Sequence, residues 1–136
     1  FCKFIIYYFN NDIKYILVEL SFMESPKNLF DIIFKLQLEG YNVVLAHPER
    51  YAYMRMNEYD DLVKRGVLLQ INLLSLIGYY SPQIEQKTKD LIANDMVSFV
   101  GSDCHNMQHA ELYKKCQTKK AWHDLCNSGK LLNSTL

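Results

Sequence analysis

Four short apolar segments recur along this chain at almost even intervals. They begin near residues 15, 42, 67 and 97, and each is four to six residues long. Most of them lack an alternation of polar and apolar side chains, which is typical of strands buried on both faces of a parallel sheet. Each interval of 25 to 30 residues leaves room for one helix, so the chain is expected to repeat a strand–helix unit.

The intervals contain local signals for these helices. Ser81 precedes Pro82, so an N-cap residue stands before a proline that suits the first helical position. Ser25 and Pro26 repeat this pattern, and we expect a helix to begin at each pair. Glycines are expected to end three of the helices: Gly40, Gly66 and Gly129.

The composition limits the classes of protein to which the chain can belong. Its 136 residues are enough for one domain, and 49% of them are hydrophobic, so we expect a buried core. Fifteen basic residues balance fifteen acidic ones, which argues against a nucleic-acid-binding or membrane-surface protein. No apolar run approaches the ~18 residues of a membrane span. The four cysteines form no C-x-x-C pair, and a reducing cytoplasm is the expected location.

Several common catalytic motifs are absent from the sequence. Cysteine-dependent phosphatases place an arginine six positions after the cysteine, and no cysteine here is followed by arginine at that spacing. The motifs G-x-S-x-G, G-x-x-x-x-G-K-[ST] and G-x-G-x-x-G are also missing. These absences exclude the usual serine-hydrolase, P-loop and dinucleotide-binding hypotheses.

Polar side chains stand where the expected strands end. Glu19 lies near the end of the first strand and Asn72 at the end of the third. The second strand stops at His47, because the proline that follows cannot donate to a sheet ladder. Asp103 and His105 follow the fourth strand. Ligands of α/β proteins bind at the carboxyl ends of parallel strands. A doubly wound sheet and a barrel both fit the spacing, and these polar residues favour the barrel.

Four of these residues have the chemistry of metal ligands: Glu19, His47, Asp103 and His105. Mixed carboxylate and imidazole ligands suit Mn, Fe or Zn better than Ca or Mg, and a carboxylate such as Glu19 can bridge two metals. Asp103 and His105 would point to one side of an extended segment, with Cys104 pointing away. Each residue also has a simpler explanation: Glu19 as a solvated rim residue, His47 as a packing histidine, Asp103 as the N-cap of the next helix, and Asn72 as a partner of local backbone groups.

The chain resembles a known family in four segments. These are ILVELSF from residue 16, AHPERY from residue 46, V-x-x-Q-I-N-x-x-S-x-x-G from residue 67 and GSDCH from residue 101. Together they are similar to the metal-dependent protein-tyrosine phosphatases of bacterial capsule and exopolysaccharide operons. These enzymes belong to the polymerase-and-histidinol-phosphatase (PHP) superfamily. The resemblance covers about residues 15 to 110.

The resemblance implies both a fold and a set of site residues. Residues 1–136 would form a single partial PHP-type domain, the C-terminal part of a distorted (β/α)7, TIM-like barrel in which parallel strands alternate with helices. The cofactor would be Mn²⁺ in a trinuclear cluster, with Fe or Zn as alternatives, and its ligands here would be Glu19, His47, Asp103 and His105. The catalytic candidates are Arg50, His47 and Asp103. The substrate-binding candidates are Arg50, which would bind the phosphate, Asn72 and His109.

The sequence departs from the family pattern in two places. The family opens with an H-x-H motif, and no histidine precedes His47 here. We therefore expect the N-terminal strand–helix units to be missing and this chain to be inactive alone. Ala110 occupies a position where many members carry arginine, with His109 beside it. His109 and His123 fall in an expected helix, where histidines are mostly surface residues.

The function implied by the resemblance is hydrolysis of phosphotyrosine on the cytoplasmic tail of a bacterial tyrosine autokinase that controls polysaccharide export. One alternative is a PHP-type phosphatase of a small phosphate ester, similar to histidinol phosphatase. Another is a non-catalytic fragment that acts as a binding module. Metal analysis separates the last case, since a binding module would hold no cluster.

Overall fold

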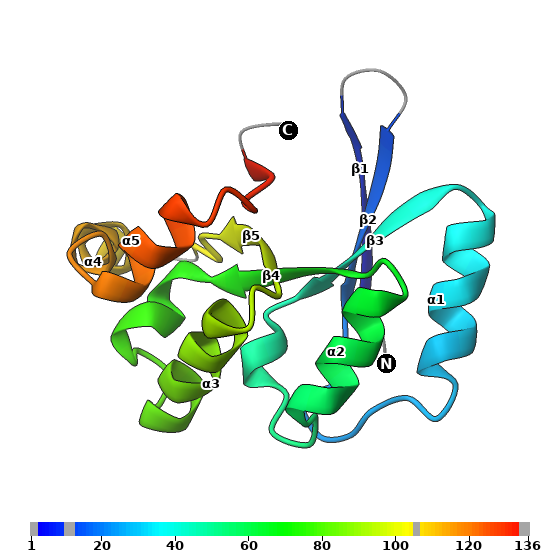
Figure 1. Ribbon diagram of the computed structural model, residues 1–136, viewed down its shortest axis with the longest axis horizontal. Coiled ribbons are helices and arrows are strands. Elements are labelled where there is room, and N and C mark those ends of the chain that lie inside the picture. Colours follow the sequence, from blue (N-terminus) through cyan, green and yellow to red (C-terminus); the bar gives the residue numbers. More distant parts are fainter. Residues whose placement is uncertain (1–2, 10–12, 105–106, 134–136) are drawn as a thin grey trace.

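The structure of the protein is a computed structural model that describes residues 3–9, 13–104 and 107–133 (Figure 1). Its strands form one sheet in the order β1-β2-β3-β4-β5. The strand bounds are β1 Lys3–Phe9, β2 Ile13–Glu19, β3 Tyr41–Ala46, β4 Leu68–Asn72 and β5 Val97–Gly101. Strands β2 to β5 run parallel to one another, which confirms the predicted parallel sheet of four strands.

Strand β1 lies outside the predicted repeat and is a correction to it. It pairs antiparallel with β2, from Lys3 opposite Glu19 to Phe9 opposite Ile13. The two strands follow each other closely in the sequence, and a parallel pairing would need a crossover of roughly a dozen residues or more. The prediction that all strands are parallel is therefore wrong at this edge. The described strands form an open sheet whose edges are β1 and β5.

The described residues form helices in every predicted interval. The α-helices are α1 Leu29–Leu38, α2 Met56–Lys64, α3 Pro82–Ala93, α4 Met107–Cys116 and α5 Lys120–Asn127, and the 3₁₀ helices are η1 Pro48–Arg50 and η2 Leu73–Ile77. One α-helix separates each successive pair of parallel strands, which confirms the strand–helix repeat. Within the described ranges, no helix combines the length and the apolar character needed to cross a membrane.

The two serine–proline signals have different outcomes. Ser81 is the N-cap of α3, and its hydroxyl oxygen accepts a hydrogen bond from the Ile84 N–H at 3.2 Å. Ser25 does not cap a helix, so that prediction is wrong. Helix α1 begins only at Leu29, whose N–H donates to the Pro26 carbonyl oxygen at 3.1 Å. The chain after Ser25 thus forms a turn before it becomes helical.

Glycine ends the helices where the sequence predicts it. Gly40, Gly66 and Gly129 follow α1, α2 and α5 with φ values of 85°, 83° and 69°. These values lie in the left-handed region, which a glycine adopts without the steric cost that other residues bear.

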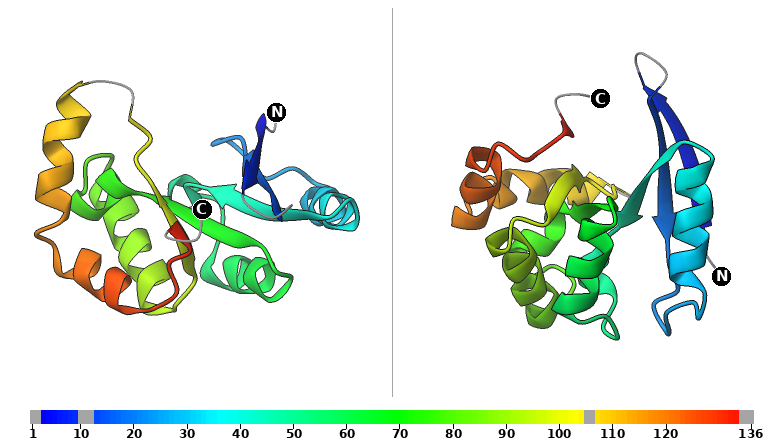
Figure 2. Two further views of the ribbon diagram at one scale, coloured as in Figure 1. Left: turned by 90° about the horizontal axis from the view of Figure 1, so that it is seen from above. Right: turned by 45° about the vertical axis from the view of Figure 1, so that its right-hand side comes forward.

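One face of the sheet packs against helices, and the other faces a cleft. Val18, Leu45 and Ile71 belong to the buried core, and Figures 1 and 2 show α2 and α3 together on one side of β4. Leu17 and Gln70 alternate with these core residues and line the cleft on the opposite face, where both stay partly exposed. The prediction of burial on both faces is wrong at Leu17 and Gln70, but it is confirmed for β3, where Val44 and Ala46 on this second face are buried as well.

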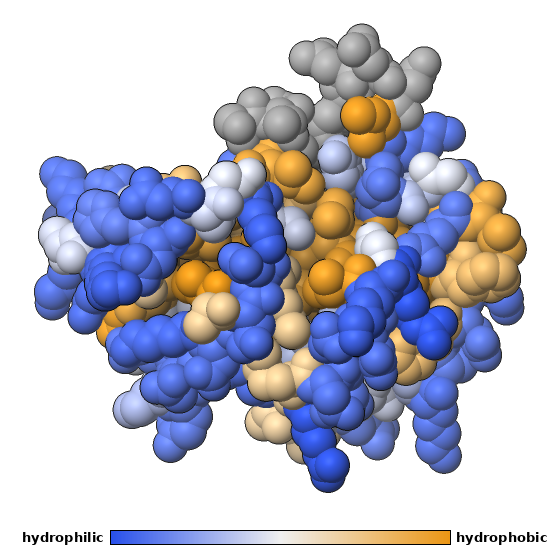
Figure 3. Space-filling model, viewed as in Figure 1, coloured by the Kyte–Doolittle hydropathy of each residue, from blue (hydrophilic) through white to orange (hydrophobic). Residues whose placement is uncertain are grey.

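Helix α1 carries an apolar stripe on its outer surface. Phe30, Phe34 and Leu38 are four residues apart, so they share one side of the helix, and they are 42%, 60% and 70% exposed. Figure 3 shows hydrophobic residues gathered on the side of the molecule where α1 lies. The Arg65 guanidinium carbon lies 4.8 Å from the centroid of the Phe30 ring and covers part of this stripe.

The cap of α3 gives a test of the fold. Ser81→Ala should lower the free energy of unfolding by about 1 kcal/mol, because the Ile84 N–H loses its acceptor. Asn28→Ala is the matched control, since Asn28 is the N-cap of α1 but makes no side-chain cap hydrogen bond. Urea unfolding followed by circular dichroism measures both values. Equal losses in the two variants would contradict the role of the Ser81 hydroxyl.

Candidate active site

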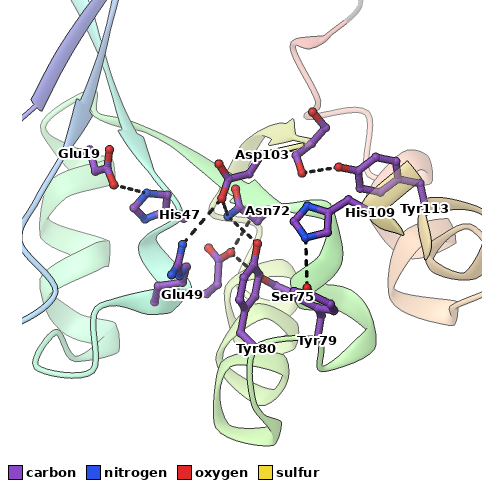
Figure 4. A network of polar contacts seen from close by, with 12 residues as sticks. Glu19, His47, Glu49, Asn72, Ser75, Tyr79, Tyr80, Asp103, His109 and Tyr113 are labelled. Carbon is purple, nitrogen blue, oxygen red and sulfur yellow. Dashed lines mark hydrogen bonds and ion pairs between the residues drawn. The ribbon is translucent and has the colours of Figure 1, made fainter. Parts of the chain in front are cut away.

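The carboxyl ends of the parallel strands open into a cleft of about 530 Å³. Five of the predicted site residues line it: Glu19, His47, Arg50, Asn72 and Asp103. The rest of its lining is Ile5, Leu17, Ala46, Gln70, Gly101 and Ser102. Figure 4 shows the polar network at this place, with side chains from several strand ends turned toward one another. The structure thus brings together residues that are up to 84 positions apart (from 19 to 103) in the sequence.

His47 is placed by the abrupt end of β3. Its N–H donates to the Gln70 carbonyl oxygen at 2.7 Å, and its φ of 34° then turns the chain out of the sheet into η1. Ring atom Nε2 lies 3.2 Å from Oε1 of Glu19. Burial lowers the pKa of His47, although the Glu19 carboxylate acts in the opposite direction. The neutral imidazole that metal ligation requires is therefore favoured.

Arg50 ends η1 and is held by three neighbours. Its Nη1 lies 3.8 Å from Oδ2 of Asp103. Its guanidinium carbon lies 4.5 Å from the ring centroid of Phe22 and 4.6 Å from that of Tyr80. The side chain remains 27% exposed. A planar guanidinium held in this way is suited to bidentate contact with a phosphate that enters the cleft.

Asn72 connects the end of β4 to Asp103. Its Nδ2 donates to Oδ2 of Asp103 at 2.9 Å and lies 3.5 Å from the Tyr80 hydroxyl oxygen. Asp103 has a φ of 47°, so the chain turns sharply just beyond β5. Asn72 therefore orients the Asp103 carboxylate, a role that sequence reasoning missed. Its predicted contact with substrate stays a prediction.

Glu49 is a residue of the site that sequence reasoning missed. Its side chain is buried with 2% exposed. Oxygen Oε1 accepts hydrogen bonds from the Asn72 N–H at 2.9 Å and from the Ser75 hydroxyl at 2.6 Å. Burial raises the pKa of Glu49, while these two hydrogen bonds lower it. The signal in the sequence was a carboxylate three residues after the end of an apolar strand, β3.

The histidines near the C-terminal end differ from prediction in one case. His109 on α4 was expected at the surface, and that is wrong, since only 7% of it is exposed. Helix α4 packs against η2, which brings the His109 Nε2 to 3.1 Å from the Tyr79 hydroxyl oxygen. It lies outside the lining of the cleft, and its role in substrate binding stays a prediction. His123 is exposed, as predicted. His105 lies outside the described residues.

Two of the predicted metal ligands lie side by side in the described residues. Glu19 and His47 bring a carboxylate oxygen and an imidazole nitrogen into contact, and both are ligand types of Mn, Fe and Zn. The Asp103 carboxylate instead meets Asn72 and Arg50. Within the described ranges, no three His, Cys, Asp or Glu side chains lie close enough to hold a metal ion. The pair fits two positions of a metal shell, and the predicted four-ligand set stays a prediction.

Removal of the Glu49 carboxylate should lower the stability of the protein. Glu49→Ala leaves the Asn72 N–H and the Ser75 hydroxyl buried without their acceptor, so we expect the free energy of unfolding to fall by about 2–4 kcal/mol. Glu49→Gln keeps an acceptor oxygen and should lose less. Chemical unfolding of both variants measures the difference, and indistinguishable losses would argue against the two hydrogen bonds.

Comparison with known proteins places this cleft in a family. A family model described as "Capsular polysaccharide synthesis, CpsB/CapC" matches residues 7–124. Tyrosine-protein phosphatase YwqE of Bacillus subtilis (strain 168) is 38% identical over 100 residues, which are 72% of this chain and 39% of YwqE. Tyrosine-protein phosphatase CpsB of Streptococcus pneumoniae is 27% identical over 110 residues, 76% of this chain and 45% of CpsB.

A solved structure agrees with these matches. It comes from work on YwqE and CpsB, described as unique metal-dependent tyrosine phosphatases, and it matches with a TM-score of 0.67 and 32% identity over 90% of this chain. The chain spans about half the length of that structure, 53%, and less of the two relatives. The family match takes in the ends of all four parallel strands that build the cleft. The chain therefore belongs to the CpsB/CapC family of capsular polysaccharide synthesis.

Proposed function

We propose that this chain carries part of the active site of a metal-dependent phosphatase that hydrolyses phosphotyrosine in proteins. The observation that carries the proposal is the cleft at the strand ends, which combines the Glu19–His47 pair with the guanidinium of Arg50. A carboxylate–imidazole pair supplies metal ligands, and an arginine supplies a phosphate-binding group. The names of the relatives, which are tyrosine-protein phosphatases, support the same chemistry.

The metal in this proposal is Mn²⁺ in a trinuclear cluster, with Fe or Zn as alternatives that suit the same ligands. Glu19, His47, Asp103 and His105 would hold part of it. The remaining ligands would come from an H-x-H segment on further strands, which would complete a distorted (β/α)7 barrel of the PHP type over the open face of the sheet. The coverage of the matched structure, 53%, is consistent with this arrangement. Residues 1–136 alone would then be inactive.

The residues of this chain would bind and orient the phosphoryl group. A bound metal would supply a water nucleophile of lowered pKa and would stabilise charge on the phosphoryl oxygens. Arg50 would exchange its 3.8 Å contact with Asp103 for two phosphoryl oxygens. Asn72 would keep the Asp103 carboxylate in place during this exchange. Burial lowers the pKa of His47, which favours the neutral imidazole whose ring nitrogen has a lone pair for ligation.

The protein substrate that we propose is the phosphotyrosine-containing cytoplasmic tail of a tyrosine autokinase that controls capsular or exopolysaccharide synthesis. The family description, which names capsular polysaccharide synthesis, supports this assignment. A phosphatase that acts on such a tail would work in the cytoplasm.

Metal ligation should carry the activity, and cysteine chemistry should not. In the full-length protein, His47→Ala and Asp103→Asn should abolish hydrolysis of an aryl phosphate and lower the amount of metal bound per chain. Cys104→Ser is the control, because Cys104 is exposed beside the site but has no assigned role. Metal content by mass spectrometry and turnover are measured together. An activity that survives chelation and depends on Cys104 would refute the proposal.

Arg50 should contribute geometry as well as charge. Arg50→Lys keeps the positive charge but loses the planar pair of donors, so turnover of an aryl phosphate should fall at least tenfold, about 1.4 kcal/mol or more. Metal content should stay unchanged, since Arg50 is not among the proposed ligands. Kinetics close to those of the unmodified protein would assign Arg50 to surface structure instead.

A further inference from the structure

Phe22 is a large aromatic residue that stays exposed beside a polar cleft. It lies between β2 and α1, and 43% of it is accessible to solvent. The cleft itself is lined mainly by charged and polar groups at its strand-end side. Charged and polar neighbours give a phenyl ring little hydrophobic stabilisation. Contacts with particular neighbours hold the ring in place instead.

The contacts of Phe22 fix the ring against residues of the site. Its centroid lies 5.3 Å from that of the His47 ring and 5.9 Å from that of the Tyr51 ring, with interplanar angles of 32° and 31°. The Arg50 guanidinium carbon lies 4.5 Å from the same centroid. Two of these three neighbours, His47 and Arg50, line the cleft.

The support behind Phe22 is rigid. Tyr51 is fully buried, and its hydroxyl oxygen accepts a hydrogen bond from the Leu20 N–H at 2.9 Å. Tyr51 also stacks on Tyr53, whose hydroxyl donates to the Ser21 carbonyl oxygen at 2.8 Å. These bonds hold both residues that immediately precede Phe22. The exposed ring is thus preorganised, which lowers the entropic cost of placing a ligand against it.

We propose that Phe22 is a specificity-determining residue that selects aryl phosphates, such as phosphotyrosine, over alkyl phosphates. This inference rests on the proposed function, in which Arg50 binds the phosphate. A phosphate held by Arg50 leaves its ester substituent beside the guanidinium, where the exposed part of Phe22 stands. A phenyl substituent packs there in offset or edge-to-face contact, and an ethyl group offers no ring for that contact.

The size of the effect follows from the strength of one aromatic pair. Such a pair contributes binding free energy in addition to that of the buried area, and this contribution changes affinity roughly three- to tenfold. Phe22→Ala should therefore weaken the binding of phenyl phosphate and leave the affinities for ethyl phosphate and inorganic phosphate unchanged. Phe22→Leu keeps an apolar side chain without a ring, so it should also lose the preference for phenyl phosphate.

Ligand-observed NMR with phenyl phosphate, ethyl phosphate and inorganic phosphate tests the proposal. The titrations are made in the presence of a chelator, so that no turnover consumes the ligand. The unmodified protein should bind phenyl phosphate more tightly than ethyl phosphate, and Phe22→Ala should remove the difference. Phe34→Ala is the matched control, because Phe34 is a 60% exposed phenylalanine on the outer side of α1. Thermal unfolding confirms that each variant is folded.

Three results would overturn the inference. The unmodified protein could show no preference for phenyl phosphate, or Phe22→Ala could weaken all three ligands equally, which would limit Phe22 to holding Arg50. Binding of none of the phosphates would also overturn it. The proposed function fails separately, through the absence of Arg50-dependent hydrolysis in the metal-loaded enzyme, so the two failures are distinguishable.

Discussion

The buried carboxylate of Glu49 is the interaction on which the geometry of the cleft depends. It belongs to η1, the short helix that also carries Arg50, and it accepts hydrogen bonds from the Asn72 N–H and the Ser75 hydroxyl at the end of β4 and in η2. Main-chain and side-chain donors are thus satisfied where two neighbouring strands end, and the turn after β3 is tied to the turn after β4. A buried carboxylate is costly without such partners, so the two turns are held as one unit.

The remaining contacts of the site build on this connection. The backbone N–H of Asn72 donates to Glu49, and the side-chain Nδ2 of Asn72 donates to Asp103, so Asn72 connects the two carboxylates. Arg50 then lies between this carboxylate and the aromatic side chains that flank it. Each group restricts the next one, so the cleft is largely formed before any ligand enters. Preformed polar groups of this kind cost little reorganisation when charge develops on a bound phosphate.

The parallel strands and most helix ends were predictable because they depend on residues close in sequence. Short apolar segments, the Ser81 cap and the terminal glycines act locally, and the structure agrees with them. The antiparallel β1 escaped prediction because it stands outside the repeat. The hydrogen bond that the Asn72 N–H donates to Glu49 and the contact of His109 with Tyr79 join residues 23 and 30 positions apart, and no local pattern reports such contacts. Residue types at strand ends therefore revealed where the cleft is, but not how its side chains are held.

His47 and Asp103 both hold left-handed backbone conformations, with φ values of 34° and 47°. A residue with a Cβ atom pays roughly 1–2 kcal/mol for this conformation, whereas glycine adopts it freely. Glycine at either position would relieve the strain but delete an imidazole or a carboxylate that faces the cleft. Natural selection for stability and natural selection for chemistry therefore act in opposite directions at these two positions. The strained backbone at His47 and Asp103 is therefore kept for the side chains that it presents to the cleft, and the contacts of those side chains with their neighbours offset part of its cost.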